Sequence, residues 1–286
     1  MTNSDQQLEV LIKNALAEDI GDGDHSTLSC IPVAAKGKAV LKIKEKGIVA
    51  GVLIAEKIFR WMQPECSFTH VKKDGDAMVY GETAFEVEAN VHTILQCERL
   101  VLNCMQRMSG IATLTSKYVE KIKGYPCKLL DTRKTTPNFR LLEKEAVRIG
   151  GGVNHRFGLF DRIMLKDNHI DYCGGIEKAI EMAYDYVQTI KPGLQIEVET
   201  RSLEDVKKVM AIGKVNRIML DNFSPELLRE AIGVILGEYE TEASGGIDLS
   251  NIEAYAATGV DFISCGAIIH QARSLDLSLK AQVVGP

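Results

Sequence analysis

The sequence predicts a parallel α/β fold, either a barrel or a doubly wound sheet, that follows a smaller α+β unit. In the second half of the chain, short apolar runs alternate with segments of helical periodicity. The last four runs end at Glu199, Asp221, Ser244 and Ser264, separated by 22, 23 and 20 residues, which is the length of one strand–helix unit. No Gly-x-Gly-x-x-Gly motif follows the first strand, which argues against a dinucleotide-binding domain.

The first half of the chain predicts helices and antiparallel strands. Residues 5–19 have the apolar spacing of an amphipathic helix. Residues 38–50 and 66–90 alternate between polar and apolar side chains and contain turn glycines, a pattern typical of antiparallel strands, with a helix between the two stretches. A long helix is expected over 91–123, broken or kinked at Gly110.

Polar residues stand at the ends of the six predicted strands of the second half. These residues are Asp131, Lys166, Glu199, Asp221, Ser244 and Ser264. In an α/β barrel the carboxyl ends of the strands meet at one mouth, where the catalytic groups lie. The last two strands lead into Ser244-Gly245-Gly246 and Ser264-Cys265-Gly266, and glycine turns late in a barrel often bind phosphate through backbone N–H groups. We therefore predict a phosphate site in these two loops.

The stretch 131–171 is locally basic in an acidic chain. It holds eight Lys and Arg against six Asp and Glu, whereas the whole chain holds 34 against 39. Its basic groups are Arg133-Lys134, His155-Arg156 after a triple glycine, and Lys166. Such a cluster suits a small polyanion better than a nucleic acid, which requires a broad basic face. The remaining charges have helical spacing and are expected to form a solvated helix face, namely Arg140, Glu143, Lys144, Glu145 and Arg148.

Cysteine usage and hydropathy predict a cytoplasmic protein without a membrane segment. The seven cysteines are scattered and form no CxxC pair, as in reduced intracellular proteins. Cys97 and Cys104 lie seven residues apart on the predicted long helix and are expected to pack in a core. The N-terminus lacks the pattern of a secretory signal, and no apolar run reaches the roughly 20 residues of a membrane helix.

Several long motifs make the chain similar to the quinolinate phosphoribosyltransferase family. The most specific is DTRKTTP at 131–137, continued by GGGVNHRFGLFDRIMLKDNHI. EVET, LDNF, EASGGI and ISCGAIIH follow in order, and LAEDIGDGDHST and ERLVLNCMQRMSGIAT precede them, so the resemblance covers nearly the whole chain. One departure is Asn138, where the family often has glycine; asparagine tolerates the left-handed backbone of a turn.

The resemblance implies a fold and an activity. The fold is an incomplete, TIM-like α/β barrel in residues 113–270 and an α+β sandwich domain in residues 1–112, to which residues 271–286 return. The activity is phosphoribosyl transfer from phosphoribosyl pyrophosphate to quinolinate with decarboxylation, which gives nicotinate mononucleotide, pyrophosphate and CO₂ in NAD biosynthesis. Mg²⁺ is the implied cofactor. The implied assembly is a cytoplasmic homodimer with shared active sites, or a hexamer.

The resemblance also assigns roles to residues. The catalytic set is Lys134, Lys166, Glu199 and Asp221, of which the two acids hold the ribose and Mg²⁺, the metal largely through substrate and water. Arg99 is expected to reach quinolinate from the other subunit. The full set of substrate-binding residues is Arg99, Thr132, Arg133, Lys134, His155, Arg156, Lys166, Glu199, Asp221, Ser244, Gly245, Gly246, Ser264, Cys265 and Gly266.

Three other functions account for parts of the sequence. The nearest is a related pyrophosphorylase-like paralogue associated with molybdate transport, and the full set of Arg133, His155-Arg156 and Lys166 argues against it. A Schiff-base aldolase would use Lys166 at a barrel strand end but would not need the neighbouring arginines. An anion sensor or RNA-binding protein is disfavoured by the acidic total and by the lack of a basic, aromatic stripe.

Overall fold

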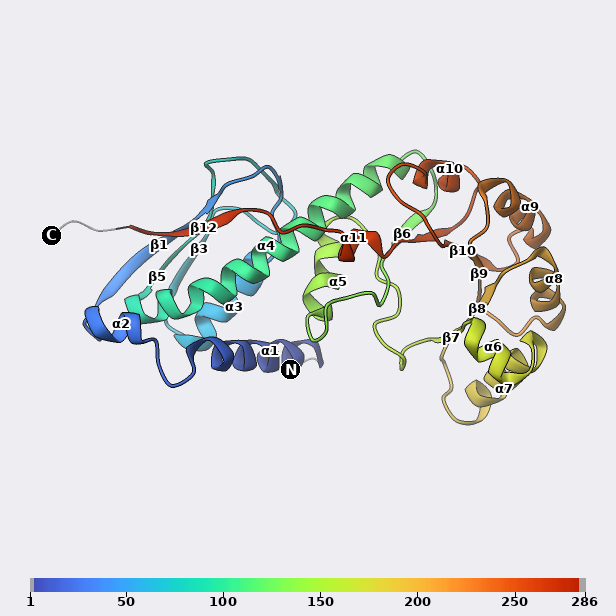
Figure 1. The fold of residues 1–286 in the computed structure, drawn as a ribbon, viewed down its shortest axis with the longest axis horizontal. Coiled ribbons are helices and arrows are strands. Elements are labelled where there is room, and N and C mark those ends of the chain that lie inside the picture. Colours follow the sequence, from blue (N-terminus) through green and yellow to red (C-terminus); the bar gives the residue numbers. More distant parts are fainter. Residues whose placement is uncertain (1–2, 283–286) are drawn as a thin grey trace. The chain divides into compact units, whose positions relative to one another are not determined.

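The structure, a computed structural model, describes residues 3–282, which form two compact units. Unit 1 comprises residues 1–116, 135–151 and 269–286, and unit 2 comprises the intervening segments 117–134 and 152–268. Residues 1, 2 and 283–286, which the predicted domain limits include, lie outside the described residues. Each unit is described by itself below, with its elements labelled in Figure 1.

Unit 1 is built on a four-stranded antiparallel sheet with the strand order β12-β1-β5-β3. Helix α3 packs on this sheet, and the rings of Phe59 on α3 and Phe85 on β5 meet edge to face at 6.2 Å. The elements are α1 (Asn3–Ile20), α2 (His25–Cys30), β1 (Lys36–Ile43), β2 (Gly47–Ile48), α3 (Val52–Met62), β3 (Ser67–His70), β4 (Ala77–Met78), β5 (Thr83–Asn90), α4 (Val91–Ile122, which continues into unit 2), α5 (Arg140–Ile149) and β12 (Leu277–Gln282).

Helix α4 runs without a break for 32 residues, so the predicted break at Gly110 is wrong. A Cβ atom at this position would lie 1.9 Å from the carbonyl oxygen of Arg273. Glycine is therefore needed because the C-terminal segment crosses the helix there at close range. The same segment donates from the N–H of Leu275 to the carbonyl of Gln106. Cys97 and Cys104, also on α4, are buried as predicted.

Helix α5 corrects the predicted solvated face. Glu143 is fully buried and binds Arg107 of α4 with an Nη2–Oε1 distance of 2.8 Å, and it also accepts from the N–H of Thr136. Lys144 is only 2% exposed. The pair of Arg148 and Glu145 is exposed, as predicted. Helical spacing shows which side chains share a face, but it does not show which face another element covers.

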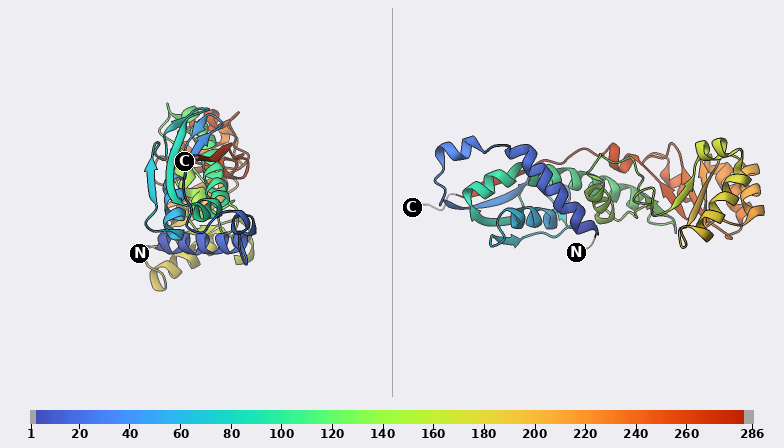
Figure 2. Two further views of the ribbon diagram at one scale, coloured as in Figure 1. Left: turned by 90° about the vertical axis from the view of Figure 1, so that its left-hand side faces the viewer. Right: turned by 90° about the horizontal axis from the view of Figure 1, so that it is seen from below.

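Unit 2 is an open parallel α/β barrel, which confirms the predicted fold class. Its six strands are parallel in the order β6-β11-β10-β9-β8-β7, and helices α7 to α10 lie along their outer side (Figures 1 and 2). Within residues 3–282 no ladder joins β6 to β7, so the barrel is incomplete. The elements are β6 (Lys128–Leu130), β7 (Ile163–Leu165), α6 (Asp167–Cys173), α7 (Ile176–Thr189), β8 (Ile196–Thr200), α8 (Leu203–Ile212), β9 (Arg217–Asp221), α9 (Pro225–Ile235), β10 (Glu240–Ser244), α10 (Ile252–Ala256), β11 (Phe262–Ser264) and α11 (Ala267–His270).

The six predicted strand ends are confirmed by β6 to β11. Each strand of the sheet stops at, or within one residue of, the polar residue expected from the sequence. Asn138, in unit 1, adopts the left-handed conformation expected of it, with φ 61°.

Candidate active site

Two layers of polar side chains lie on the inner face of the barrel, because every second residue of a strand points to the same side. The alternating residues are Arg162, Met164 and Lys166 around β7, Glu197 and Glu199 on β8, Arg217, Met219 and Asp221 on β9, and Glu240, Glu242 and Ser244 on β10. The residues at the carboxyl ends are here called the mouth cluster, namely Lys166, Glu199, Asp221 and Ser244. The residues below them are called the base cluster, namely Arg162, Glu197, Arg217, Glu242 and the loop residue His155.

The mouth cluster holds one acid whose charge is incompletely compensated. Lys166 Nζ lies 3.4 Å from Glu199 Oε2, and the side chain of Lys166 is 48% exposed whereas that of Glu199 is 7% exposed. Burial raises the pKa of Glu199, the nearby charge of Asp221 raises it further, and Lys166 opposes both. A cation or a hydrogen-bond donor from a ligand would stabilise this carboxylate.

The two predicted phosphate loops differ in their backbone conformation and in their hydrogen bonds. Gly245 and Gly246 follow β10 with φ values of 97° and 61°, which a residue with a side chain adopts only under strain. In the second loop, the thiol of Cys265 donates to the carbonyl of Ile247 and its N–H donates to the carbonyl of Leu130. Cys265 is thus bonded to the barrel itself, and its predicted contact with phosphate stays a prediction.

Two guanidinium groups share the region beside β6 and β7. The side chain of Arg156 donates from Nη1 to the carbonyl of Arg162 at 3.1 Å. Burial lowers the pKa of Arg156, and the positive charge of Arg133 lowers it further. Arg133 and Lys134 are exposed, and the N–H of Lys134 donates to Thr132 Oγ1. Because like charges meet here, an anion bound between the arginines would be stabilised.

Asp131 and Arg99, two residues that the sequence singles out, are not part of the mouth cluster. Asp131, at the end of β6, is fully buried and accepts from the N–H of His155 at 2.8 Å. It therefore holds the loop that carries His155 and Arg156. Arg99 is exposed on α4 in unit 1.

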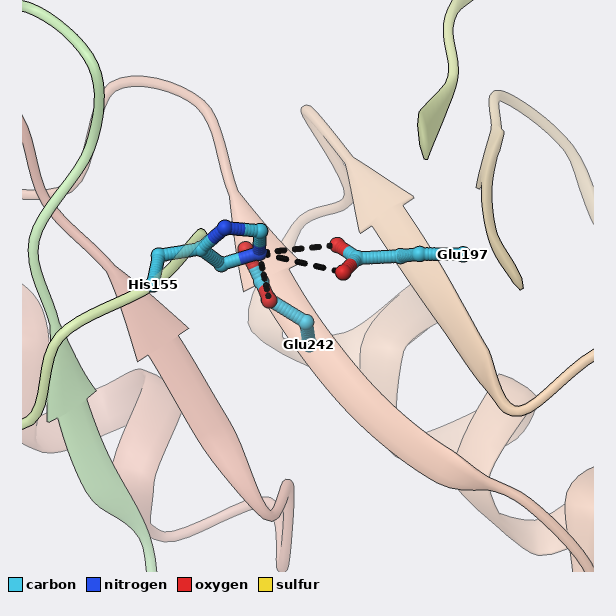
Figure 3. Close-up of side chains that lie close together, drawn as sticks. All are labelled: His155, Glu197 and Glu242. Carbon is cyan, nitrogen blue, oxygen red and sulfur yellow. Dashed lines mark hydrogen bonds and ion pairs between the residues drawn. The ribbon is translucent and has the colours of Figure 1, made fainter. Parts of the chain in front are cut away.

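The base cluster centres on His155, as Figure 3 shows. Its Nε2 lies 3.0 Å from Glu197 Oε2 and 3.3 Å from Glu242 Oε2. The histidine comes from the loop before β7, and the two acids come from β8 and β10. Both carboxylates are fully buried and the imidazole is 6% exposed. The inward alternation of the two strands thus brings residues from distant parts of the sequence to one point.

Two arginines neutralise these buried acids. Arg162 Nη1 lies 3.2 Å from Glu197 Oε2, and Arg217 Nη1 lies 2.9 Å from Glu242 Oε2. The guanidinium of Arg217 also stacks 3.9 Å from the ring centre of Phe262. Burial opposes the charge of Glu242, but the contacts with His155 and Arg217 outweigh burial and lower its pKa, so its charged form is favoured in the fold. Burial and the nearby charge of Glu242 raise the pKa of Glu197, although His155 and Arg217 oppose this shift.

The protonation of His155 results from opposing contacts. Burial lowers its pKa, but the hydrogen bonds to Glu197 and Glu242 outweigh burial and raise the pKa to about 9. The N–H of Arg156 lies 2.7 Å from Nδ1, which accepts a hydrogen bond only in the neutral ring, so this contact opposes protonation. Two buried carboxylates outweigh one backbone dipole, so we assign the charged ring at neutral pH. Both ring nitrogens face protein groups, and the predicted contact of His155 with quinolinate stays a prediction.

His155 is among the residues that the sequence predicts for the site, whereas the acids and arginines of the base cluster are not. The acids of the cluster stand inside runs with the sequence pattern of apolar strands, such as Ile196-Glu197-Val198. Ligand atoms of His155, Glu197 and Glu242 lie within 4.8 Å of one another, a spacing that suits a metal ion. The two guanidinium groups already supply the compensating positive charge, so the cluster needs no cation for balance. Charges at every second strand position would have been the signal.

Comparisons with known proteins agree with this fold and these motifs. Residues 24–109 match the N-terminal domain of quinolinate phosphoribosyl transferase, and residues 111–280 match the C-terminal domain. The chain is 43% identical over 288 residues to the chloroplastic nicotinate-nucleotide pyrophosphorylase [carboxylating] of Arabidopsis thaliana, covering 96% of this chain and 82% of that one.

Solved structures give the same result. NadC from Streptococcus pyogenes superposes with a TM-score of 0.90 at 42% identity and covers 96% of this chain and 95% of its own. The nicotinate-nucleotide pyrophosphorylase from Francisella tularensis superposes with a TM-score of 0.90 at 39% identity and covers 99% and 98%.

Fold and site together define an open parallel α/β barrel with arginines and carboxylates at its strand ends. The chain belongs to the quinolinate phosphoribosyltransferase family, as its motifs predicted. The family's two domains account for almost the whole length of the chain. No helix within residues 3–282 combines the length and apolar character needed to span a membrane.

Proposed function

We propose that this protein transfers a phosphoribosyl group from phosphoribosyl pyrophosphate to quinolinate and releases pyrophosphate, CO₂ and nicotinate mononucleotide. One observation carries the proposal: the positive charge of Arg133 is near enough to Arg156 to lower its pKa, so two guanidinium groups lie close together beside the strand ends. Quinolinate has two adjacent carboxylates, and arginine forks bind carboxylates through two parallel hydrogen bonds. The relatives' names support the same activity. No observation favours the paralogue associated with molybdate transport.

The mouth cluster supplies groups suited to the ribose. Glu199 and Asp221 lie near the carboxyl ends of the neighbouring strands β8 and β9. Glu199 is a buried carboxylate whose negative charge is not fully compensated by nearby cations. When pyrophosphate departs, the anomeric carbon develops positive charge, and a nearby carboxylate stabilises it. The same two acids have the oxygen donors that Mg²⁺ prefers, and the bound ion would neutralise charge on the pyrophosphate.

The decarboxylation follows from the transfer. Attack by the ring nitrogen on the anomeric carbon forms the N–C bond and makes the pyridinium cationic. The ring then accepts the electron pair of the breaking bond to the 2-carboxylate, CO₂ leaves, and a proton adds at that carbon. The protein's part is to hold both carboxylates with Arg133, Arg156 and Lys166, and to exclude water.

The experiment combines the purified protein with quinolinate, phosphoribosyl pyrophosphate and Mg²⁺. We expect nicotinate mononucleotide and CO₂ in equal amounts. Nicotinate, which has one carboxylate, should be a very poor substrate, because a cation that the bound ligand covers and leaves without a carboxylate costs up to roughly 3–5 kcal/mol. Comparable turnover of nicotinate and quinolinate, or no turnover of quinolinate, would refute the proposal.

We also propose a cytoplasmic homodimer in which Arg99 serves the partner's site. Arg99 is exposed and belongs to unit 1, whereas Arg133 belongs to unit 2. Arg99→Ala and Arg133→Ala should each be nearly inactive, and mixed dimers should regain part of the activity because one of their two sites carries neither change. Absence of recovery in verified mixed dimers would rule out the shared site.

A further inference from the structure

Asn222 has an unusual backbone at the edge of the mouth cluster. It follows β9 directly and has φ 57°, and the non-glycine residues with positive φ within residues 3–282 are Asn138, Asn222 and Leu236. Left-handed backbone is unfavourable for residues with a Cβ, and such outliers gather at functional sites. Asn222 is the one of these three that lies next to a predicted catalytic residue, Asp221.

The side-chain amide of Asn222 contacts two parts of the candidate site. Its Nδ2 donates to Asp221 Oδ2 at 2.6 Å. Its Oδ1 occupies the space beside Gly245, where a Cβ atom would lie 2.2 Å from it. The main-chain N–H of Asn222 donates to the carbonyl of Ser244 at 2.8 Å and extends the pairing of β9 with β10.

A turn alone does not explain this residue. The left-handed backbone after β9 would be adopted more easily by glycine. Asparagine adds an amide whose donor faces the Asp221 carboxylate and whose acceptor faces the glycine loop. Both neighbours of that amide are predicted to bind the same substrate, Asp221 at the ribose and the glycine loop at a phosphate.

We propose that Asn222 is a positioning residue that fixes the Asp221 carboxylate relative to the loop at Gly245. The inference rests on the proposed function, because it assumes that phosphoribosyl pyrophosphate binds across these two groups. Because the amide of Asn222 holds Oδ2 of Asp221, the Asp221 carboxylate stays oriented toward the ribose. Because Oδ1 of Asn222 packs on Gly245, the separation between the glycine loop and Asp221 is fixed, so that ribose and phosphate bind together.

Asn222→Gly distinguishes the effect of the side-chain amide from that of the turn. Glycine keeps the left-handed backbone but lacks both side-chain contacts. We expect the KM for phosphoribosyl pyrophosphate to rise about tenfold, the effect of one hydrogen bond to a charged group. The KM for quinolinate should not change and the Tm should not fall. An unchanged KM for phosphoribosyl pyrophosphate would overturn the inference.

Leu236→Gly is the matched control. Leu236 has φ 52°, lies at the end of α9 in unit 2, and is 78% exposed. The change relieves the same backbone conformation without touching the mouth cluster, so both KM values should stay at the wild-type level. An equal rise in KM in this variant would show that backbone relief alone causes the effect and would overturn the inference.

A second variant and a binding assay separate this inference from the proposed function. Asn222→Asp keeps the shape of the side chain beside Gly245, but it replaces the amide donor with a second carboxylate. This variant should weaken the binding of phosphoribosyl pyrophosphate more than Asn222→Gly does. Calorimetry measures binding of phosphoribosyl pyrophosphate without turnover. An inactive wild type would refute the proposed function. Equal affinity of wild type and both Asn222 variants would refute the positioning role alone.

Discussion

The two polar clusters of the barrel stand on the same strands but differ in how their charges are compensated. In the base cluster, Glu242 is fully buried, meets Arg217 and His155, and has a lowered pKa. In the mouth cluster, Glu199 is nearly as buried, meets one lysine at 3.4 Å, and has a raised pKa. Glu242 on β10 is therefore compensated by two cations of the fold, whereas Glu199 on β8 has one half-exposed lysine, and a ligand can supply a further cation.

The largest effect on activity is expected at Lys166, the cation of the mouth cluster. Lys166→Ala should lower kcat/KM by about 10²–10³, the usual cost of removing one preorganised electrostatic group. Lys166→Arg keeps the charge but changes reach and geometry, so its activity should lie between that of the alanine variant and the wild type. Steady-state kinetics with both substrates measures this.

The same residue distinguishes the transferase from an aldolase. Borohydride reduction in the presence of substrate should leave no adduct on Lys166 by mass spectrometry, because the transferase forms no Schiff base. A stoichiometric, substrate-dependent adduct would contradict the transferase mechanism. A Lys166→Arg variant, which cannot form a Schiff base, serves as the control.

A smaller effect is expected from pH, through the base cluster. The folded-state pKa of His155 is raised to about 9 from its ordinary 6.5. Its contribution to stability is therefore full below pH 6.5 and is lost as pH rises through 9, by roughly 3 kcal/mol. The groups that face the ring are Glu197 and Glu242, and chemical denaturation across this range measures the loss.

His155→Gln is the reference for that titration. Glutamine keeps a donor for the acids but has no titrating group, so the difference in unfolding free energy between wild type and variant should shrink from pH 6.5 to pH 9. A difference that stays constant would mean that the contact of the Arg156 N–H with Nδ1 keeps the ring neutral.

The smallest effect is expected at Glu240, which shares Arg217 with Glu242. Glu240 Oε2 lies 2.8 Å from Arg217 Nη2, but its side chain is 50% exposed. Water replaces an exposed partner, so Glu240→Gln should cost less than about 1 kcal/mol of unfolding free energy. A loss of several kcal/mol would mean that the exposed Glu240 contributes as much to stability as the buried Glu242 does.

Strand periodicity carried most of the fold prediction. The spacing of the runs ending at Glu199, Asp221 and Ser244 placed three neighbouring strands correctly, because one strand–helix unit has a nearly fixed length. Spacing alone did not distinguish a barrel from a doubly wound sheet. The family's motifs predicted the barrel and its incomplete closure.

Contacts between distant segments could not be predicted in the same way. Glu197 and Glu242 looked like interruptions of apolar runs, and their partner His155 lies in a separate loop. Glu143 had the spacing of a solvated helix face, but Arg107 covers it. In each case the burial depends on which element packs on the residue, and that information is not local.

The contrast between the clusters is tested most directly by comparing Glu199→Gln with Glu242→Gln, measuring unfolding free energy and kcat/KM for both. Glu199→Gln should lower kcat/KM by about 10² and leave stability equal or higher, because the raised pKa of Glu199 shows that its charge is disfavoured in the fold. Glu242→Gln should cost about 3–5 kcal/mol of stability, the cost of breaking a buried ion pair, with a smaller loss of activity. If Glu199→Gln destabilises the protein as much as Glu242→Gln does, or leaves kcat/KM unchanged, the division into a ligand-binding mouth and a structural base is wrong.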